Sequence, residues 1–498
     1  MVLLFEDLPD LVIDHSFSYL SFPGEVFAIL ASNSRLAKAI KSQSKFETIF
    51  LEARISRNLP TVDFFERTRV KLPKTTKSTI ALAFSSDGQT LASTHGDHTV
   101  KLINVANSMK DGIKQPADGC ILAELEGHPR TPWTVKFHPT NPNLVASGCL
   151  GGELRLWDTI TKVHKTRTTL PHPVISLSFH PNGRQLAAAA GTMLYLWDFT
   201  TTNEPQVILN TAVSLRCVRF LDNGRLLVGV RSRTNTTGVT NYIRAARAQL
   251  LLYNFDEEKV KGGAHLSNPT VVVRRALLYN DAGLDVVGDT VLTCAEFWEN
   301  KQNSGGGSAA RQGAPLSPLG AHDFVGGGDA EAEQQADEED RENEKLGHER
   351  KAHLVQVQLD KPRRLQTSSS VAGGAGKLVL RANLEGLWAG SQTDNSRGTF
   401  VTSVKLSPTG EFILLGCSRG NTDNNNSSGW NHPVAAVWRL GDMKRMSTLT
   451  SRTDLDEEDD ANVALFHPQP GVGVVYGTKQ GQIACALSGS VLTSAGLL

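Results

Sequence analysis

The chain has 498 residues, and its 51 lysines and arginines balance its 51 aspartates and glutamates. A neutral chain lacks the basic excess that nucleic acids and anionic membranes require of a partner, so we expect neither. No stretch of about 18 apolar residues is present, which argues against membrane insertion. The six cysteines are scattered without a Cys-x-x-Cys pair. They fit the reducing cytoplasm or nucleus and predict no metal site. The N-terminus, MVLLFEDLPD, has no basic segment typical of a signal peptide.

Residues 1–60 are predicted to form a short helical module. Apolar residues in 8–40 follow helical spacing, Pro9 favours a helix start, and Phe22-Pro23-Gly24 separates two helices. The pattern resembles an F-box, although Ser16 and Ser32 stand where that family carries aliphatic residues. The resemblance implies docking of a ligase adaptor. Another adaptor-docking helical motif and a plain structural cap remain open. The predicted adaptor-binding residues are Leu8, Pro9, Leu11, Val12, Phe17 and Leu20.

Three similar segments follow, at 78–105, 131–158 and 172–198. Each has an alternating strand that ends in phenylalanine, a polar turn, a second apolar strand, a small-residue turn and a third strand. The turns after the phenylalanines read SSDG, HPTNPN and HPNG. This period-two pattern recurs about every 40 to 45 residues, as in the blades of a β-propeller.

The segments resemble WD repeats, since Gly127-His128 and Trp157-Asp158 supply the two ends of one full repeat. In that family a buried His, Ser or Thr, Asp and Trp link up within a blade. Asp97 supplies the aspartate in the first repeat, but Gly151 and Gly191 replace it in the next two. We therefore expect incomplete polar networks in blades two and three. The predicted network residues are His128, Ser147, Trp157, Asp158, Trp197 and Asp198.

Less regular repeats continue to the C-terminus. A fourth is predicted at 213–230, with its third strand delayed to 249–255, and a fifth opens at 282–297. Residues 300–350 are first rich in Gly and Ser and then acidic, so we expect a disordered insertion. Residues 352–359 resume the fifth blade, 399–440 form the sixth and 443–487 the seventh, with Thr68–Leu72 placed to complete the last blade. The histidines His128, His138, His180 and His467 recur at repeat positions, which indicates a structural role.

The sequence thus predicts an all-β fold, a WD-repeat β-propeller of about seven blades. A helical module (1–60) precedes its first part (66–299), the insertion (300–350) and its second part (351–498). Several segments resemble the Ambra family, the activating molecule in Beclin-regulated autophagy. They are RVKLP (69–73), STHGDHTV (93–100), GHPRTPWTVKFHP (127–139), SGCLGGELRLWD (147–158) and GVGVVYGTKQG (471–481).

The Ambra resemblance implies a substrate receptor of a cullin–RING ubiquitin ligase, linked to autophagy, that docks through the damaged-DNA-binding adaptor. Receptors for that adaptor often carry Trp-Asp-x-Arg, whereas this chain has WDTI (157–160) and WDFT (197–200). This departure favours the N-terminal helices for docking, to a Skp-type or a damaged-DNA-binding adaptor, with a protein substrate on the propeller. We expect no catalysis, cofactor or metal. The alternative is a WD-repeat scaffold without ligase association, in which the helices cap the propeller.

Overall fold

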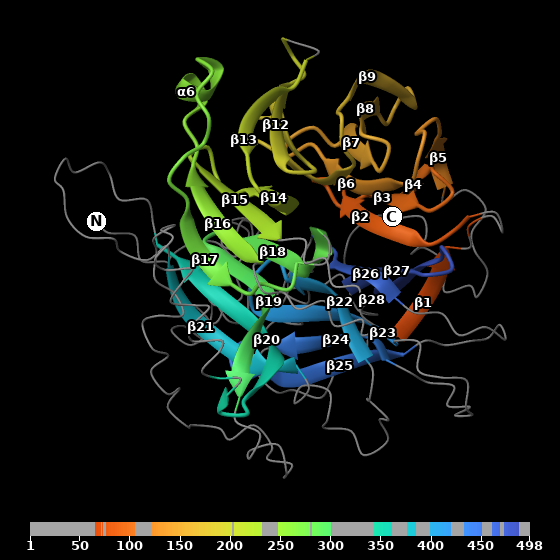
Figure 1. The fold of residues 1–498 in the computed structure, drawn as a ribbon. Helices are drawn as coiled ribbons and strands as arrows, with labels where there is room; N and C mark the ends of the chain where they lie inside the picture. Colours follow the sequence, from red (N-terminus) through yellow and green to blue (C-terminus); the bar gives the residue numbers. More distant parts are fainter. Residues whose placement is uncertain are drawn as a thin grey trace, which may run out of the picture.

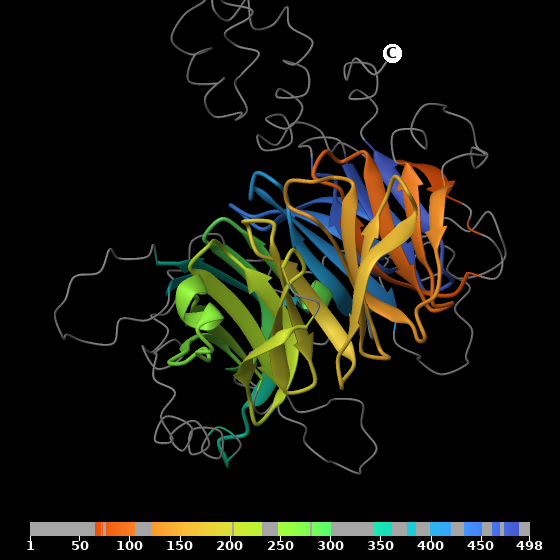
Figure 2. The same cartoon turned by 90° about the horizontal axis from the view of Figure 1, so that it is seen from above.

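The computed structural model describes residues 65–70, 72, 76–104, 121–201, 204–231, 248–278, 281–299, 343, 345–360, 376–384, 399–419, 433–450, 461–468 and 473–487. These residues form seven four-stranded antiparallel sheets, set side by side around a central axis as the blades of a propeller (Figures 1 and 2). The predicted helical module (1–60) and residues 300–342 of the insertion lie outside the described residues. The same holds for the predicted adaptor-binding residues Leu8, Pro9, Leu11, Val12, Phe17 and Leu20. No helix in the described ranges is long and apolar enough to cross a membrane.

The first three blades follow one another in chain order. Blade 1 consists of β2 (Thr79–Phe84), β3 (Thr90–His95), β4 (Val100–Asn104) and β5 (Ile121–Leu125). Blade 2 consists of β6 (Pro132–Phe137), β7 (Leu144–Cys149), β8 (Glu153–Asp158) and β9 (Val163–Thr169). Blade 3 consists of β10 (Val174–Phe179), β11 (Gln185–Ala190), β12 (Met193–Asp198) and β13 (Gln206–Asn210).

The next three blades carry longer excursions. Blade 4 consists of β14 (Ser214–Phe220), β15 (Arg225–Arg231), β16 (Gln249–Asn254) and β17 (Thr270–Arg274), with helix α6 (Glu257–Lys261) before β17. Blade 5 follows the 3-10 turn η2 (Asp281–Gly283) and consists of β18 (Leu284–Val287), β19 (Thr290–Glu299), β20 (Glu349–Leu359) and β21 (Gly376–Asn383). Blade 6 consists of β22 (Thr399–Leu406), β23 (Phe412–Arg419), β24 (Pro433–Arg439) and β25 (Lys444–Thr450).

The seventh blade joins the two ends of the described chain. It consists of β26 (Ala461–Phe466), β27 (Gly473–Thr478), β28 (Ile483–Leu487) and β1 (Phe65–Val70). Strand β1 pairs antiparallel with β28, and Figure 1 shows the red β1 beside the blue β28. The predicted closure of the ring is confirmed, although the closing strand is 65–70 and not 68–72. Because the ring is closed, every blade has a neighbouring blade on both sides.

One predicted blade boundary is wrong. Residues 444–450 were expected to open the seventh blade, but they form β25, the outer strand of blade 6. Arg439 pairs with Lys444, so a tight turn through Gly441 brings the chain straight back onto β24. The seventh blade therefore begins at Ala461. A turn signal alone does not tell whether the strand that follows returns to the same sheet or starts a new one.

The hydrophobic core consists of seven clusters, each between two successive blades. Trp157 of blade 2, for example, packs with Val100 and Leu102 of blade 1. Val463 and Ile483 of blade 7 pack with Leu82 of blade 1, which continues the core through the closure. Because each blade buries its apolar faces only against its neighbours, the ring gains its stability from the stack of blades and not from any single sheet.

Candidate binding site in the central channel

Three of the predicted network residues meet inside blade 2. The His128 Nε2 atom lies 2.7 Å from Ser147 Oγ, and the Trp157 indole N–H donates to the same oxygen at 2.8 Å. All three side chains are buried. These hydrogen bonds thus tie the segment before the blade to its two middle strands, β7 and β8.

Asp158 and Asp198 do not take part in that network. Asp158 accepts the backbone N–H groups of Ile160 and Thr161, and Asp198 accepts those of Thr200 and Thr201. These hydrogen bonds lower the pKa of Asp158. Burial raises the pKa of Asp198, but the hydrogen bonds outweigh it and the pKa of Asp198 is lowered as well. Each aspartate therefore caps the turn after its strand, as short acidic side chains commonly do.

Blade 3 replaces the polar network by an apolar one. Leu170 stands four residues before β10, as His128 stands before β6, and Ala188 takes the place of Ser147 opposite the tryptophan strand. Leu170 and Ala188 belong to the same buried cluster as Trp197. The expected incompleteness thus takes two forms, a missing aspartate in blade 2 and an apolar replacement in blade 3.

The other repeated histidines connect neighbouring blades. His138 Nε2 lies 2.7 Å from the carbonyl oxygen of Gly183, His180 Nε2 lies 3.5 Å from that of Asn223, and His467 Nε2 lies 3.0 Å from that of Gly88. In each case the histidine follows the innermost strand and reaches the turn after the innermost strand of the next blade. We call these three contacts the histidine latches. His128 is not equivalent to them, because it precedes its blade and binds within it.

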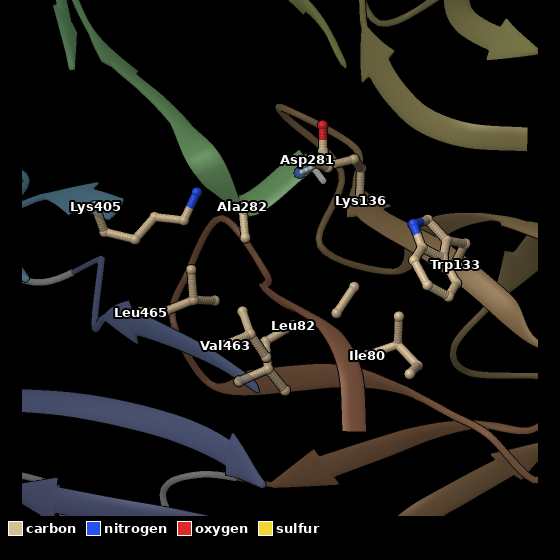
Figure 3. Close-up of a pocket in the computed structure, with 10 residues that line it drawn as sticks. Ile80, Leu82, Trp133, Lys136, Asp281, Ala282, Lys405, Val463 and Leu465 are labelled. Carbon is tan, nitrogen blue, oxygen red and sulfur yellow. Dashed lines mark ion pairs between the residues drawn. The ribbon is translucent and has the colours of Figure 1, made fainter. Parts of the chain in front are cut away.

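The innermost strands surround a small cavity in the central channel, of about 50 Å³, which has room for a few water molecules (Figure 3). Lys405 and Trp133 lie on opposite sides of it, with Val463 and Leu82 between them and Asp281 beside Lys136 at one edge. Strands from four blades contribute to its lining, which consists of Ile80, Ala81, Leu82, Trp133, Lys136, Asp281, Ala282, Lys405, Val463 and Leu465.

Asp281 is the centre of a buried charge cluster in this channel. It comes from η2, the turn that leads into blade 5, and contacts three other blades. Its Oδ1 accepts from Ser176 Oγ at 2.5 Å and from Arg219 Nη1 at 2.6 Å, and its Oδ2 lies 2.9 Å from Lys136 Nζ. Burial disfavours the carboxylate, yet Arg219 and Lys136 hold the pKa of Asp281 below its usual range. Burial and the charge of Arg219 lower the pKa of Lys136 to about 8.

A second ion pair lies across the channel. Lys405 Nζ is 3.6 Å from Asp285 Oδ1 and donates to the carbonyl oxygen of Leu284 at 3.3 Å. The cavity therefore offers an apolar wall, one half-buried tryptophan and fixed charges of both signs, which suits binding more than chemistry. Sequence patterns did not identify Asp281. It lies in the turn η2, outside any strand, where no alternation of apolar residues shows which side chains face the channel.

Comparisons with known proteins agree with the propeller architecture. The family model "WD domain, G-beta repeat" matches residues 69–104, 119–158 and 164–198, which run from the end of β1 to the end of β12. These three segments are similar to WD40 repeats, and the later blades have the same four-stranded order.

Two zebrafish (Danio rerio) relatives share part of the sequence. "Activating molecule in BECN1-regulated autophagy protein 1B" is 39% identical over 153 residues, and protein 1A is 37% identical over 163 residues. The matched stretches amount to 31% and 32% of this chain but only 10% and 12% of those relatives. A coronin-like protein of Schizosaccharomyces pombe is 29% identical over 118 residues, 24% of this chain and 19% of that protein.

A solved structure supports the fold. The β-propeller domain of Cps50 (Swd1) from Myceliophteria thermophila is similar with a TM-score of 0.50 and 13% sequence identity. The similarity covers 84% of this chain and 98% of that domain. At this identity the comparison concerns the fold alone. It agrees with a β-propeller fold.

Proposed function

We propose that the chain is a non-enzymatic, autophagy-related substrate receptor of a cullin–RING ubiquitin ligase, working in the cytoplasm or nucleus. In this proposal the N-terminal helices dock a Skp-type or damaged-DNA-binding adaptor, and the propeller holds a protein substrate. The autophagy link rests on the names of the two zebrafish relatives. The adaptor contact rests on the helical spacing of residues 8–40 and on the F-box resemblance.

The observation that carries the binding role is the channel cavity. Trp133 and Ile80 are half-buried where the innermost strands meet, and tryptophan is enriched among the residues that dominate the binding energy of protein interfaces. Lys136, Lys405 and Arg219 outnumber Asp281 and Asp285 in and beside the same cavity, which leaves an excess of positive charge. We propose that a substrate segment with an apolar side chain next to an acidic one docks there, since the two chemistries match the wall and the lysines.

The proposal is tested by affinity purification and mass spectrometry of the tagged chain from its own cells. A double change, Leu8→Ala with Pro9→Ala, should remove the adaptor and the cullin while other partners stay. A second double change, Trp133→Ala with Ile80→Ala, should remove the substrate and keep the adaptor. Ile160→Ala is the matched control, because Ile160 is a 69% exposed side chain on the outer turn of blade 2.

The alternative function is a WD-repeat scaffold without ligase association. If the wild-type chain copurifies with neither adaptor, the receptor proposal is wrong and the scaffold function stands. Thermal unfolding of each variant separates the two roles of the helices as well. Under the scaffold alternative, Leu8→Ala with Pro9→Ala lowers the melting temperature of the propeller, whereas under the receptor proposal it does not.

A further inference from the structure

Blade 2 contains a buried group of potential metal ligands that sequence patterns did not reveal. His128, Cys149 and Glu153 each offer one ligand atom, and these atoms lie within 4.8 Å of one another. All three residues are buried, with exposed fractions of 4%, 0% and 7%. They come from three places in the blade: the segment before β6, the end of β7 and the start of β8.

One of these atoms, His128 Nδ1, is buried without a hydrogen-bond partner. It lies 3.8 Å from Glu153 Oε2, an oxygen that is ion-paired with Arg155. Leaving a buried polar atom unpaired is costly, so an unpaired Nδ1 beside a carboxylate and a thiol indicates a missing ligand. The other ring nitrogen, Nε2, is already occupied by Ser147 Oγ, which fixes the ring with Nδ1 directed towards the carboxylate.

The cause is local to this repeat. Gly151 stands where the WD pattern carries an aspartate, so no side chain at that position accepts a hydrogen bond from His128 Nδ1. Cys149 Sγ lies beside the gap, where it accepts only the backbone N–H of Gly151 at 3.3 Å. Gly151 itself is exposed. A Cβ atom at that position would lie 3.0 Å from Pro129 Cγ and 3.4 Å from the sulfur, so glycine leaves the space beside the thiol unfilled.

We propose that His128 Nδ1, Cys149 Sγ and Glu153 Oε2 bind one Zn²⁺ ion, with a fourth position open towards Gly151. Imidazole, thiolate and carboxylate are the ligands that zinc takes in proteins, at about 2.0 to 2.3 Å, which places ligand atoms roughly 3.5 Å apart in a tetrahedral site. To reach this geometry, the three atoms need to approach one another by about 1 Å. On binding, the thiol loses its proton to solvent, and no electron is transferred.

Charge and hydrogen bonding around the site are compatible with this ion. Thiolate and carboxylate together balance the two charges of Zn²⁺, and the guanidinium of Arg155 leaves one positive charge beside the site. The Arg155 guanidinium contacts Glu153 Oε2 at 3.0 Å, and it also donates to the carbonyl oxygens of Glu126 and Gly127, which keep it paired when the carboxylate turns towards the metal.

Cobalt titration of the chelator-treated full-length chain tests the site, since Co²⁺ replaces Zn²⁺ in such sites and a Co²⁺–thiolate bond gives a near-ultraviolet charge-transfer band. We expect one equivalent of Co²⁺ to produce the band and Zn²⁺ to abolish it. Cys149→Ala should lose the band, and Glu153→Gln should weaken binding at least tenfold. Cys294→Ala is the matched control, because Cys294 is another buried cysteine outside the ligand group, and this variant should behave as wild type.

X-ray absorption of the zinc-loaded wild-type chain gives a second measurement that does not depend on the folding of any variant. The proposal requires one sulfur and two or three nitrogen or oxygen ligands. Absence of the cobalt band in the wild type, a band that persists in Cys149→Ala, or a zinc shell without sulfur would each overturn it. In those cases the group is a plain buried ion pair of Glu153 with Arg155, next to a histidine that serves only Ser147.

Discussion

His467 and Gly88 are 379 residues apart in sequence, yet the imidazole Nε2 lies 3.0 Å from the glycine carbonyl oxygen. This histidine latch joins blade 7 to blade 1, so it fastens the ring at the point where the chain ends meet. The His467 ring also lies edge-on to Phe84, with 5.0 Å between ring centres. The latches His138–Gly183 and His180–Asn223 repeat the same contact between blades that are adjacent in sequence.

We expect His467→Ala to lower the free energy of unfolding by about 1–3 kcal/mol, from the lost hydrogen bond and the lost packing on Phe84. Urea unfolding followed by tryptophan fluorescence measures the change. His138→Ala removes a latch between consecutive blades and serves as the comparison. A His467→Ala chain that unfolds with the wild-type midpoint would show that β1 alone closes the ring.

Gly183→Ala should be clearly more destabilising than Gly410→Ala. Both glycines have positive φ, +73° and +75°, in the turn after the innermost strand, so both substitutions cost about 1–2 kcal/mol in backbone strain. At Gly183 the added Cβ would also meet His138 Cε1 at 2.6 Å, whereas nothing lies within 4 Å of a Cβ at Gly410. The difference between the two melting temperatures therefore measures the latch. Equal shifts would contradict its contribution.

Asp281→Asn should destabilise the propeller by about 3–5 kcal/mol, because it leaves Arg219 and Lys136 buried with no carboxylate between them. The double variant Asp281→Asn with Lys136→Met should recover part of the loss, since it removes one uncompensated charge. Calorimetry of the two variants checks this. If the double variant is no more stable than the single one, the charge cluster is not what the substitution disturbs.

The stability of the chain should fall as the pH is lowered from about 6.5 towards 4. Burial, helped by the charge of Lys101, lowers the pKa of His95 to about 4. Burial, helped by the charge of Arg155, lowers the pKa of His128 to about 3. Their pKa in the unfolded chain is near 6.5, so below that pH the unfolded state binds more protons and is favoured. Each histidine contributes a slope of about 1 kcal/mol per pH unit. Urea midpoints at pH 7.5, 6 and 5 should show a smaller slope in His128→Gln, and the wild-type slope in His172→Gln, where the ring is exposed.

Deleting residues 303–342 should leave the melting temperature within about 2 °C of wild type. The strands on either side pair directly, with Glu299 opposite Glu349 at the end of the β19–β20 hairpin, so a short loop can replace the long one. The entropy of closing a loop changes only slowly with its length. Differential scanning calorimetry checks the result. A large drop, or two separate transitions for 66–299 and 351–498, would contradict a single cooperative ring.

The amino-acid sequence by itself determined the repeat frame of the fold. Phe84, Phe137 and Phe179 each precede a polar turn, and alternation of apolar residues within six-residue strands is a local signal that survives without tertiary context. The same frame located the tryptophans of β8 and β12 and the absence of an aspartate at Gly151. It also placed a closing segment near residue 68, because one outer strand was missing from the last repeat.

Only the tertiary structure decided which strand belongs to which blade and which side chains meet. Strand β25 pairs with β24 although its pattern fits the next repeat equally well, because pairing depends on the path of the turn. Asp281 enters the channel from an irregular connection, and it meets Ser176, 105 residues earlier in the chain. His128, Cys149 and Glu153 converge because the blade folds three successive segments onto one point. These contacts follow from the way strands pair within a blade and blades pack around the ring, and no spacing in the sequence encodes them.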